Sequence, residues 1–118
     1  MDKLESLLQQ IKSTPESIAF NNVISVIDDT YNFTPTGFKN GYAYNEANQN
    51  NGSCKVFAFA KLHDLSANET LHLFGDYYRI DVLKHPNNND HQNIRNFIQY
   101  GWSRISFDEK ALTELKAV

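Results

Sequence analysis

The chain has 118 residues, enough for one domain with a single core and too few for two. Hydrophobic residues make up 41% and aromatic residues 13%, a composition that excludes a disordered chain. A formal net charge of -3 leaves no basic patch for a phosphate backbone, which excludes nucleic acid as an expected partner. No apolar stretch is long enough to span a bilayer or form a signal peptide, and the single cysteine suits a reducing compartment. We therefore expect a cytoplasmic protein with no membrane partner.

The first 31 residues predict two helices. Leucine and isoleucine recur at helical spacing from Leu4 to Ile11, which predicts an amphipathic helix over 2–12. Thr14-Pro15 has the pattern of a helix start, so a second helix is expected to about residue 31. Its β-branched residues leave a strand open for 23–27. The first helix could also dock on a second copy of the chain, giving a homodimer.

The centre of the chain combines a turn with a strongly apolar helix. Asn40-Gly41 predicts a tight hairpin between two short strands. An amide-rich loop then leads to Gly52-Ser53, with Ser53 as the expected N-cap of a helix over 53–63. Six of the seven residues from Val56 to Leu62 are apolar, which predicts that this helix is buried.

Three further helices are predicted downstream. Ser66 and Glu69 form a capping box at the start of the first, which Gly75 ends. The second runs over 77–84 with Asp76 as its cap and stops before Pro86, and the third runs from Asp90, as its cap, to Tyr100.

The last residues predict a strand over 102–107 and a weakly helical tail over 108–118. The fold class is therefore mainly α (α+β). We expect a single domain over 1–118, with five or six helices around the buried helix 53–63 and a small sheet of two or three strands.

Several sequence blocks resemble the HopJ type III effector family. They are Phe33–Gly41, Asn45–Ala47, Gln49–Lys55, Phe57–Ala60, Phe74–Arg79, Asp81–Leu83, Asp90–Phe97 and Gly101–Trp102. The likeness covers about residues 15–107. It implies an effector-like protein of bacterial origin, for which export by a type III secretion system is expected from the resemblance alone. No established enzymatic activity comes with the family name.

Cys54 is the candidate for nucleophilic chemistry. It lies in the first turn of the predicted central helix, where the helix dipole favours a thiolate. His91 would be its base, with Asp90 or Asn93 orienting the imidazole. The alternative is structural, with Cys54 as a small apolar core residue and His91 in the first turn of a helix.

A metal site is a second alternative, on Asp81 and His85 at helical spacing with Asp90 and His91 nearby. The same residues are typical of a solvated rim, so we assign no metal. The sequence has no cofactor-binding motif, and we expect no cofactor.

The third candidate is a binding surface of amides, aromatic rings and one arginine. Its members are Asn45, Glu46, Gln49, Asn50, Asn51, Tyr77, Tyr78, Arg79 and Asn93. Amides donate and accept hydrogen bonds without carrying charge, and tyrosine and arginine are enriched where interfaces carry energy. The same amides could instead satisfy loop backbone and cap helices.

Two structural expectations accompany this surface. The loop 45–51 and the helix start 90–93 should meet, because both precede apolar helices that share one core. The pairs Glu46–Arg79 and Lys55–Asp76 could form ion pairs that fix the loop.

We therefore favour a non-enzymatic binding domain that presents its Asn-rich loop to a protein partner or a small polar ligand. The alternative is a cysteine-dependent hydrolase or transferase that uses Cys54 and His91.

Overall fold

The computed structural model describes residues 2–115. Its helices are α1 (Lys3–Ser13), η1 (Pro15–Ser17), α2 (Phe20–Thr30), α3 (Asn51–Leu62), α4 (Ala67–His72), η2 (Tyr77–Val82), α5 (Gln92–Tyr100) and η3 (Trp102–Arg104). Its strands are β1 (Tyr31–Phe33), β2 (Phe38–Asn40), β3 (Ala43–Asn45), β4 (Ile105–Phe107) and β5 (Leu112–Glu114).

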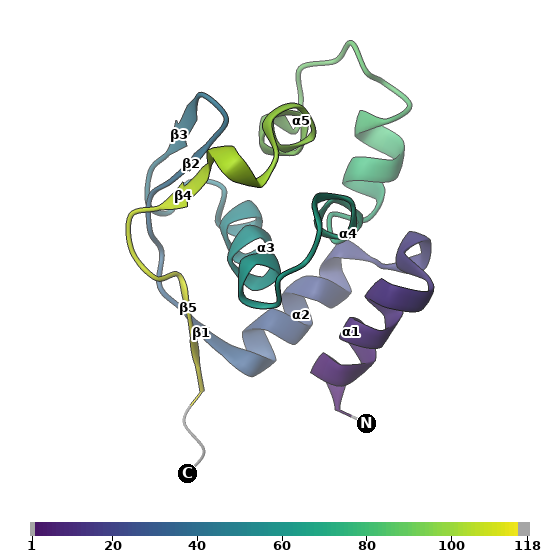
Figure 1. Cartoon of the computed structure of the whole chain (residues 1–118), viewed down its shortest axis with the longest axis vertical. Coiled ribbons are helices and arrows are strands. Elements are labelled where there is room, and N and C mark those ends of the chain that lie inside the picture. The colour runs from purple at the N-terminus through teal and green to yellow at the C-terminus, as the bar shows by residue number, and fades with distance from the viewer. Residues whose placement is uncertain (1, 116–118) are drawn as a thin grey trace.

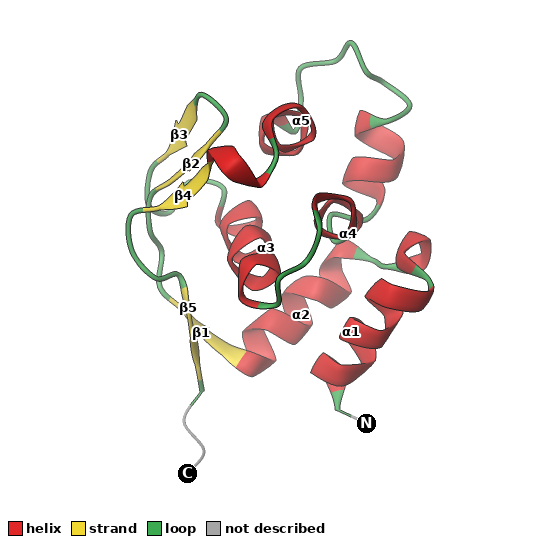
Figure 2. Ribbon diagram, in the orientation of Figure 1, coloured by secondary structure: helices red, strands yellow, loops and turns green. Residues whose placement is uncertain are grey.

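Helix α3 occupies the middle of the molecule, as Figure 1 shows, with α2, α4 and α5 around it. The strands gather on one side of α3, and most helices lie on the other (Figure 2). The mainly α architecture with a small sheet, predicted from the sequence, is confirmed.

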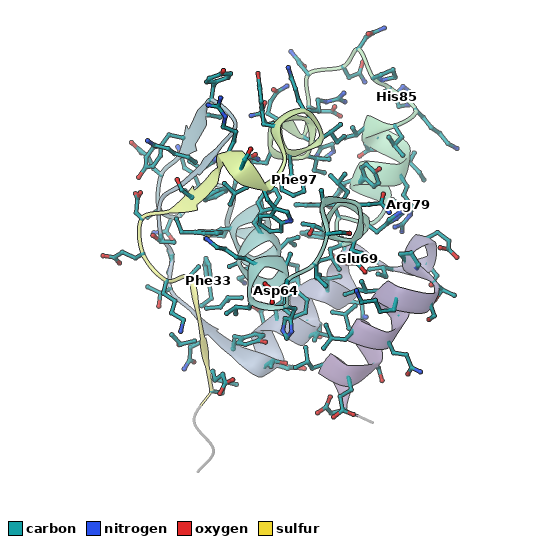
Figure 3. All side chains as sticks on the ribbon, viewed as in Figure 1. Phe33, Asp64, Glu69, Arg79, His85 and Phe97 are labelled. Carbon is teal, nitrogen blue, oxygen red and sulfur yellow. The ribbon has the colours of Figure 1, made fainter. Side chains whose placement is uncertain are left out.

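The core is aromatic and centred on Phe57 of α3, which is fully buried. Its ring centroid lies 4.9 Å from that of Phe97 on α5 and 5.4 Å from that of Phe74 after α4. It also lies 6.2 Å from Phe38 on β2 and 6.4 Å from Trp102 on η3. These are the tilted and edge-on spacings that aromatic rings prefer. One side chain therefore joins the helical side to the sheet, and Figure 3 shows Phe97 near the middle of the structure.

The second helix does not begin at Pro15. Residues 15–17 form a single 3-10 turn, the chain then extends through Ile18, and α2 starts at Phe20. Arg79 explains the interruption, because its guanidinium donates to the carbonyls of Pro15 and Ile18 and so satisfies oxygens that a continuous helix would have used. Residues 23–27 are helical, so the strand alternative is wrong.

The hairpin at Asn40-Gly41 is confirmed, with β2 and β3 antiparallel. Strand β4 pairs with the other edge of β2, which gives the order β3-β2-β4. The predicted strand over 102–107 begins as the 3-10 turn η3 and becomes extended at Ile105.

The predicted helical tail over 108–118 is wrong for the residues that the structure describes. Strand β5 pairs antiparallel with β1, with Leu112 opposite Phe33. Burying Ala111 and Leu112 against the core outweighs the weak helical preference of this segment. Residues 116–118 lie outside the described part of the chain.

The capping predictions have mixed outcomes. The capping box of Ser66 and Glu69 is confirmed in both of its hydrogen bonds. Ser53 is not the N-cap of α3, because the helix begins at Asn51 and Asn50 is its N-cap. Asp76 has helical backbone angles and caps nothing with its side chain, and its neighbours form the π-helix η2. The N-cap of α5 is His91 rather than Asp90, whose carboxylate accepts from Arg95 instead.

Candidate functional site

A cavity of about 380 Å³ lies where α3 and α5 begin. It is lined by Phe20, Ala43, Asn45, Asn50, Gly52, Ser53, Phe74, Tyr77, His91, Gln92, Asn93, Ile94 and Asn96. The lining contains amides, hydroxyls, aromatic rings and one imidazole, with no Asp, Glu, Lys or Arg. These groups recognise a ligand by hydrogen bonds and ring contacts rather than by fixed charge.

An asparagine network forms the polar wall of this cavity. Asn93 Nδ2 donates to Asn45 Oδ1 at 3.0 Å, and Asn45 Nδ2 donates back to Asn93 Oδ1 at 3.2 Å. Asn50 Nδ2 donates to Asn45 Oδ1 at 2.7 Å, and the buried Asn40 donates to the carbonyl of Asn93. The predicted meeting of loop 45–51 with the start of α5 is therefore confirmed. Asn45 and Asn93 are 6% and 9% exposed, so their amides are fixed in place.

Two helix starts border the same cavity. The N-cap residues Asn50 and His91 both have left-handed backbone angles, with φ of 55° and 51°. Neither cap makes a side-chain hydrogen bond to its own helix. The N-cap side chains of α3 and α5 thus leave the first-turn N–H groups beside this cavity free to donate hydrogen bonds to an oxygen or anionic atom of a ligand.

Aromatic rings form the opposite wall. The ring of Phe20, at the start of α2, lies 5.1 Å from Tyr77 in an edge-on contact and 6.3 Å from Phe74. Gly52 approaches the same ring so closely that an added Cβ would stand 3.1 Å from Phe20 Cζ. A side chain at position 52 would therefore require the Phe20 ring of the cavity wall to shift.

His91 lies at the rim among acidic groups. Its Nε2 is 3.0 Å from Asp81 Oδ2 and 3.9 Å from Asp90 Oδ2, and its ring centroid is 5.0 Å from that of Tyr77. Arg95 donates to Asp90 Oδ1 at 2.6 Å, and this hydrogen bond holds the pKa of the Asp90 carboxyl below its usual value. The predicted grouping of Asp81, Asp90 and His91 is thus present. His85 lies on the exposed loop after η2 and is not part of it (Figure 3).

Cys54 does not share this cavity. Its side chain is 1% exposed and its Sγ lies 4.0 Å from the carbonyl oxygen of Thr36, on the side of α3 that faces the core. Burial raises the pKa of the thiol to about 11, so the thiolate expected from the helix dipole is wrong. Within residues 2–115 no hydrogen bond joins Cys54 to His91, whose imidazole contacts Asp81 instead.

Three residues of the predicted surface belong to the outer face of the loop. Gln49 Oε1 accepts from the Glu46 backbone N–H at 3.1 Å, which closes the turn. The Asn51 amide reaches Asn48 at 3.5 Å. None of Glu46, Gln49 and Asn51 lines the cavity.

Residues 77–79 point in different directions, because the π-helix carries them around its axis. Tyr77 lines the cavity, whereas Tyr78 is buried and its ring meets that of His72 edge-on at 5.5 Å. Arg79 faces the link before α2 and lies beside η1 in Figure 3.

The two suggested ion pairs are wrong. Arg79 is occupied by carbonyl oxygens, including that of His72 at 3.2 Å, and Glu46 is exposed. Lys55 pairs with Asp28 of α2 at 2.8 Å rather than with Asp76.

Sequence reasoning missed eight lining residues, which are Phe20, Ala43, Gly52, Ser53, Phe74, Gln92, Ile94 and Asn96. Gly52 and Ser53 carried a usable signal, since they follow the amide-rich loop at a helix start. The rings of Phe20 and Phe74 carried none, because aromatic residues at helix ends are far more often core.

Comparisons with known proteins agree with this architecture. A family model described as HopJ type III effector protein matches residues 4–112. A crystal structure titled as that of unknown function protein VPA0580 superposes with a TM-score of 0.94 at 52% sequence identity. The match covers 98% of this chain and 95% of that one. No curated protein matches the chain.

Within residues 2–115, no helix has both the length and the apolar character needed to cross a bilayer. The structure whose fold this chain shares carries no assigned activity in its title, so the relationship defines ancestry rather than chemistry. With nearly its whole length covered by the family model, the chain belongs to the HopJ type III effector protein family.

Proposed function

We propose that this protein is a binding domain whose cavity between the starts of α3 and α5 takes a small polar ligand. The observation that carries the proposal is the convergence of the Asn45–Asn93 amide network with two helix starts that lack side-chain caps. Binding sites of this size are concave, partly apolar and equipped with a few fixed polar groups.

The lining supports a ligand with an acceptor-rich head and a flat or apolar body. First-turn N–H groups and Gln92 can donate to a carboxylate or phosphate oxygen, as helix starts do elsewhere. Phe20 and Tyr77 offer ring faces and edges to the remainder. In the described lining, the partly buried His91 imidazole is accompanied by the hydroxyls of Ser53 and Tyr77, and binding requires no nucleophile among them.

The Asn-rich loop has a different part in this proposal from the one expected from sequence. Its inner members, Asn45 and Asn50, shape the wall, while Glu46 and Gln49 close the turn behind them. The cysteine-dependent reaction has no comparable support, because Cys54 faces the core with its pKa raised. Export as an effector is a proposal that the family membership alone supports.

The test is a titration followed by two-dimensional amide NMR. The panel contains inorganic phosphate, citrate, sugar phosphates and free amino acids. We expect at least one compound to shift the backbone amides of Gly52, Ser53, Gln92 and Asn93 in a saturable way.

Ser53→Leu fills the cavity from a position that lines it, and should abolish the shifts. Ser13→Leu places the same side chain at the exposed end of α1 and is the matched control. Shifts that survive Ser53→Leu, or a panel that moves no cavity amide, would overturn the proposal.

A further inference from the structure

Asp81, Asp90 and His91 form a cluster of side chains at the rim of the cavity. We infer that Asp81, Asp90 and His91 form a binding site for one divalent transition ion of the zinc or manganese class. The inference deepens the proposed function, because the ion would lie beside the ligand cavity and offer it an open coordination position.

The first argument is the geometry of the three side chains. One ligand atom from each of Asp81, Asp90 and His91 lies within 4.8 Å of the other two. Atoms bound to one ion at about 2.0–2.2 Å are separated by about 3–3.5 Å, and the His91–Asp81 distance of 3.0 Å already lies in that range. The 3.9 Å from His91 Nε2 to Asp90 Oδ2 is longer than this range, so ion binding requires these two groups to move closer together.

The second argument is that Arg95 holds the Asp90 carboxylate in position. Arg95 binds Asp90 through Oδ1 and leaves Oδ2 directed toward the imidazole. The same guanidinium donates to the carbonyls of Asp90 and Pro86, so it fixes the loop that carries the aspartate. Ligating carboxylates in metal sites are usually hydrogen-bonded in this way from behind.

The third argument is the π-helix that supplies Asp81. A wider turn of this kind is rare and is often found at functional sites. Here the hydrogen bond from Leu83 N–H to the Tyr78 carbonyl, at 3.0 Å, defines the wide turn. It brings both Tyr77 and Asp81 to His91: the ring of Tyr77, which lines the cavity, lies 5.0 Å from the imidazole, and Asp81 Oδ2 lies 3.0 Å from Nε2.

The donor set decides the class of ion. One imidazole nitrogen with two carboxylates suits zinc, manganese or ferrous iron better than calcium or magnesium, which prefer oxygen alone. Three protein ligands leave further coordination positions for water or for an acceptor atom of the proposed ligand. Of the three, His91 lines the cavity, so the proposed ion would lie at its rim, next to the ligand.

The experiment titrates chelator-treated protein with zinc chloride or manganese chloride alone, by calorimetry and, for manganese, by the loss of the free-ion EPR signal. We expect a stoichiometry of one. Asp81→Asn and His91→Gln should each weaken binding by at least about tenfold. His85→Gln, on the exposed loop a few residues away, should bind as the natural chain does.

Asp81→Asn keeps the size of a half-exposed side chain, so its melting temperature without metal reports whether the fold is intact. Three results would overturn the inference. Neither ion binds the natural chain, binding survives both Asp81→Asn and His91→Gln, or His85→Gln loses binding. Failure here is distinguishable from failure of the proposed function, because the amide shifts with phosphate or citrate are measured without metal.

Discussion

Successive residues of one helix divide between core and cavity in this protein. Cys54 and Ser53 are neighbours on α3, yet the thiol faces Thr36 in the interior and Ser53 lines the cavity. An α-helix turns by about 100° per residue, so neighbours meet different surroundings. The residue that looks reactive in sequence is therefore a packing residue, and the one beside it is available to a ligand.

Native Cys54 should react slowly with a bulky aromatic disulfide reagent at neutral pH. The side chain is 1% exposed, so the reagent reaches the sulfur rarely. Burial also raises the pKa of the thiol to about 11, so little thiolate is present at neutral pH. The labelling rate in the native state is compared with that in guanidinium. Labelling as fast as that of free cysteine would contradict the buried position.

His63 should contribute an acid-sensitive part of the stability. Its Nε2 lies 2.7 Å from the Tyr31 hydroxyl, and burial lowers its pKa below the ordinary value of 6.5. As the pH falls below the unfolded value, the unfolded chain takes up a proton before the folded one does, so stability decreases until the folded pKa is passed. His72 shifts in the same direction, also through burial.

The free energy of unfolding of His63→Gln should consequently fall less than that of the natural chain between about pH 7.5 and 5. Urea titrations across this interval measure it. His85→Gln, in an exposed loop, is the control and should keep the natural slope. An unchanged slope in His63→Gln would contradict the assignment.

At the scale of elements, the site depends on the joining of β3, the loop before α3 and the first turn of α5. Asn45 and Asn93 exchange two hydrogen bonds across these elements, and Asn40 adds a bond from β2. Buried amides that hydrogen-bond to one another fix the relative position of the elements that carry them.

Asn45→Ala and Asn93→Ala should therefore be non-additive. The double mutant is expected to deviate from the sum of the single effects on unfolding free energy by about 0.5–3 kcal/mol. Pairing Asn93→Ala with Asn88→Ala, in the exposed loop, should be additive within about 0.5 kcal/mol. Additivity for both pairs would show that the network does not couple the elements.

Local signals account for the elements that were predicted well. The capping box at Ser66 and the turn at Asn40-Gly41 need only a few adjacent residues, and both are confirmed. The interruption before α2 depends on Arg79, about sixty residues away in sequence, and the three-residue strand β5 depends on its partner β1. The cavity could be predicted from the sequence only in part. Its amides were recognisable, whereas its aromatic wall depends on how distant segments pack.

At the scale of the whole molecule, Phe57 joins both sides of the fold through four aromatic neighbours. Phe57→Ala should cost about 3–5 kcal/mol of unfolding free energy, a large share of a typical domain's stability. Leu83→Ala, at an exposed position, should change it by no more than about 0.5 kcal/mol.

Urea unfolding followed by Trp102 fluorescence measures both, because the indole packs against Phe57 and Phe97. Phe57→Leu gives a milder variant should the alanine chain fail to fold. If Phe57→Ala and Phe57→Leu each lose less than about 1 kcal/mol of unfolding free energy, the core is not organised around this ring.

Burial of the single thiol has a practical consequence for studying this protein. A cysteine introduced on the surface would be the one position that accepts a fluorophore or spin label under native conditions, with no need to remove Cys54 first. Lys39 on β2 is an exposed attachment point in the middle strand of the sheet whose edge strand, β3, supplies Asn45 to the cavity wall. Because Cys54 stays unlabelled in the native protein, the signal of a label at the introduced cysteine alone can be used to follow occupancy of the cavity by spectroscopy.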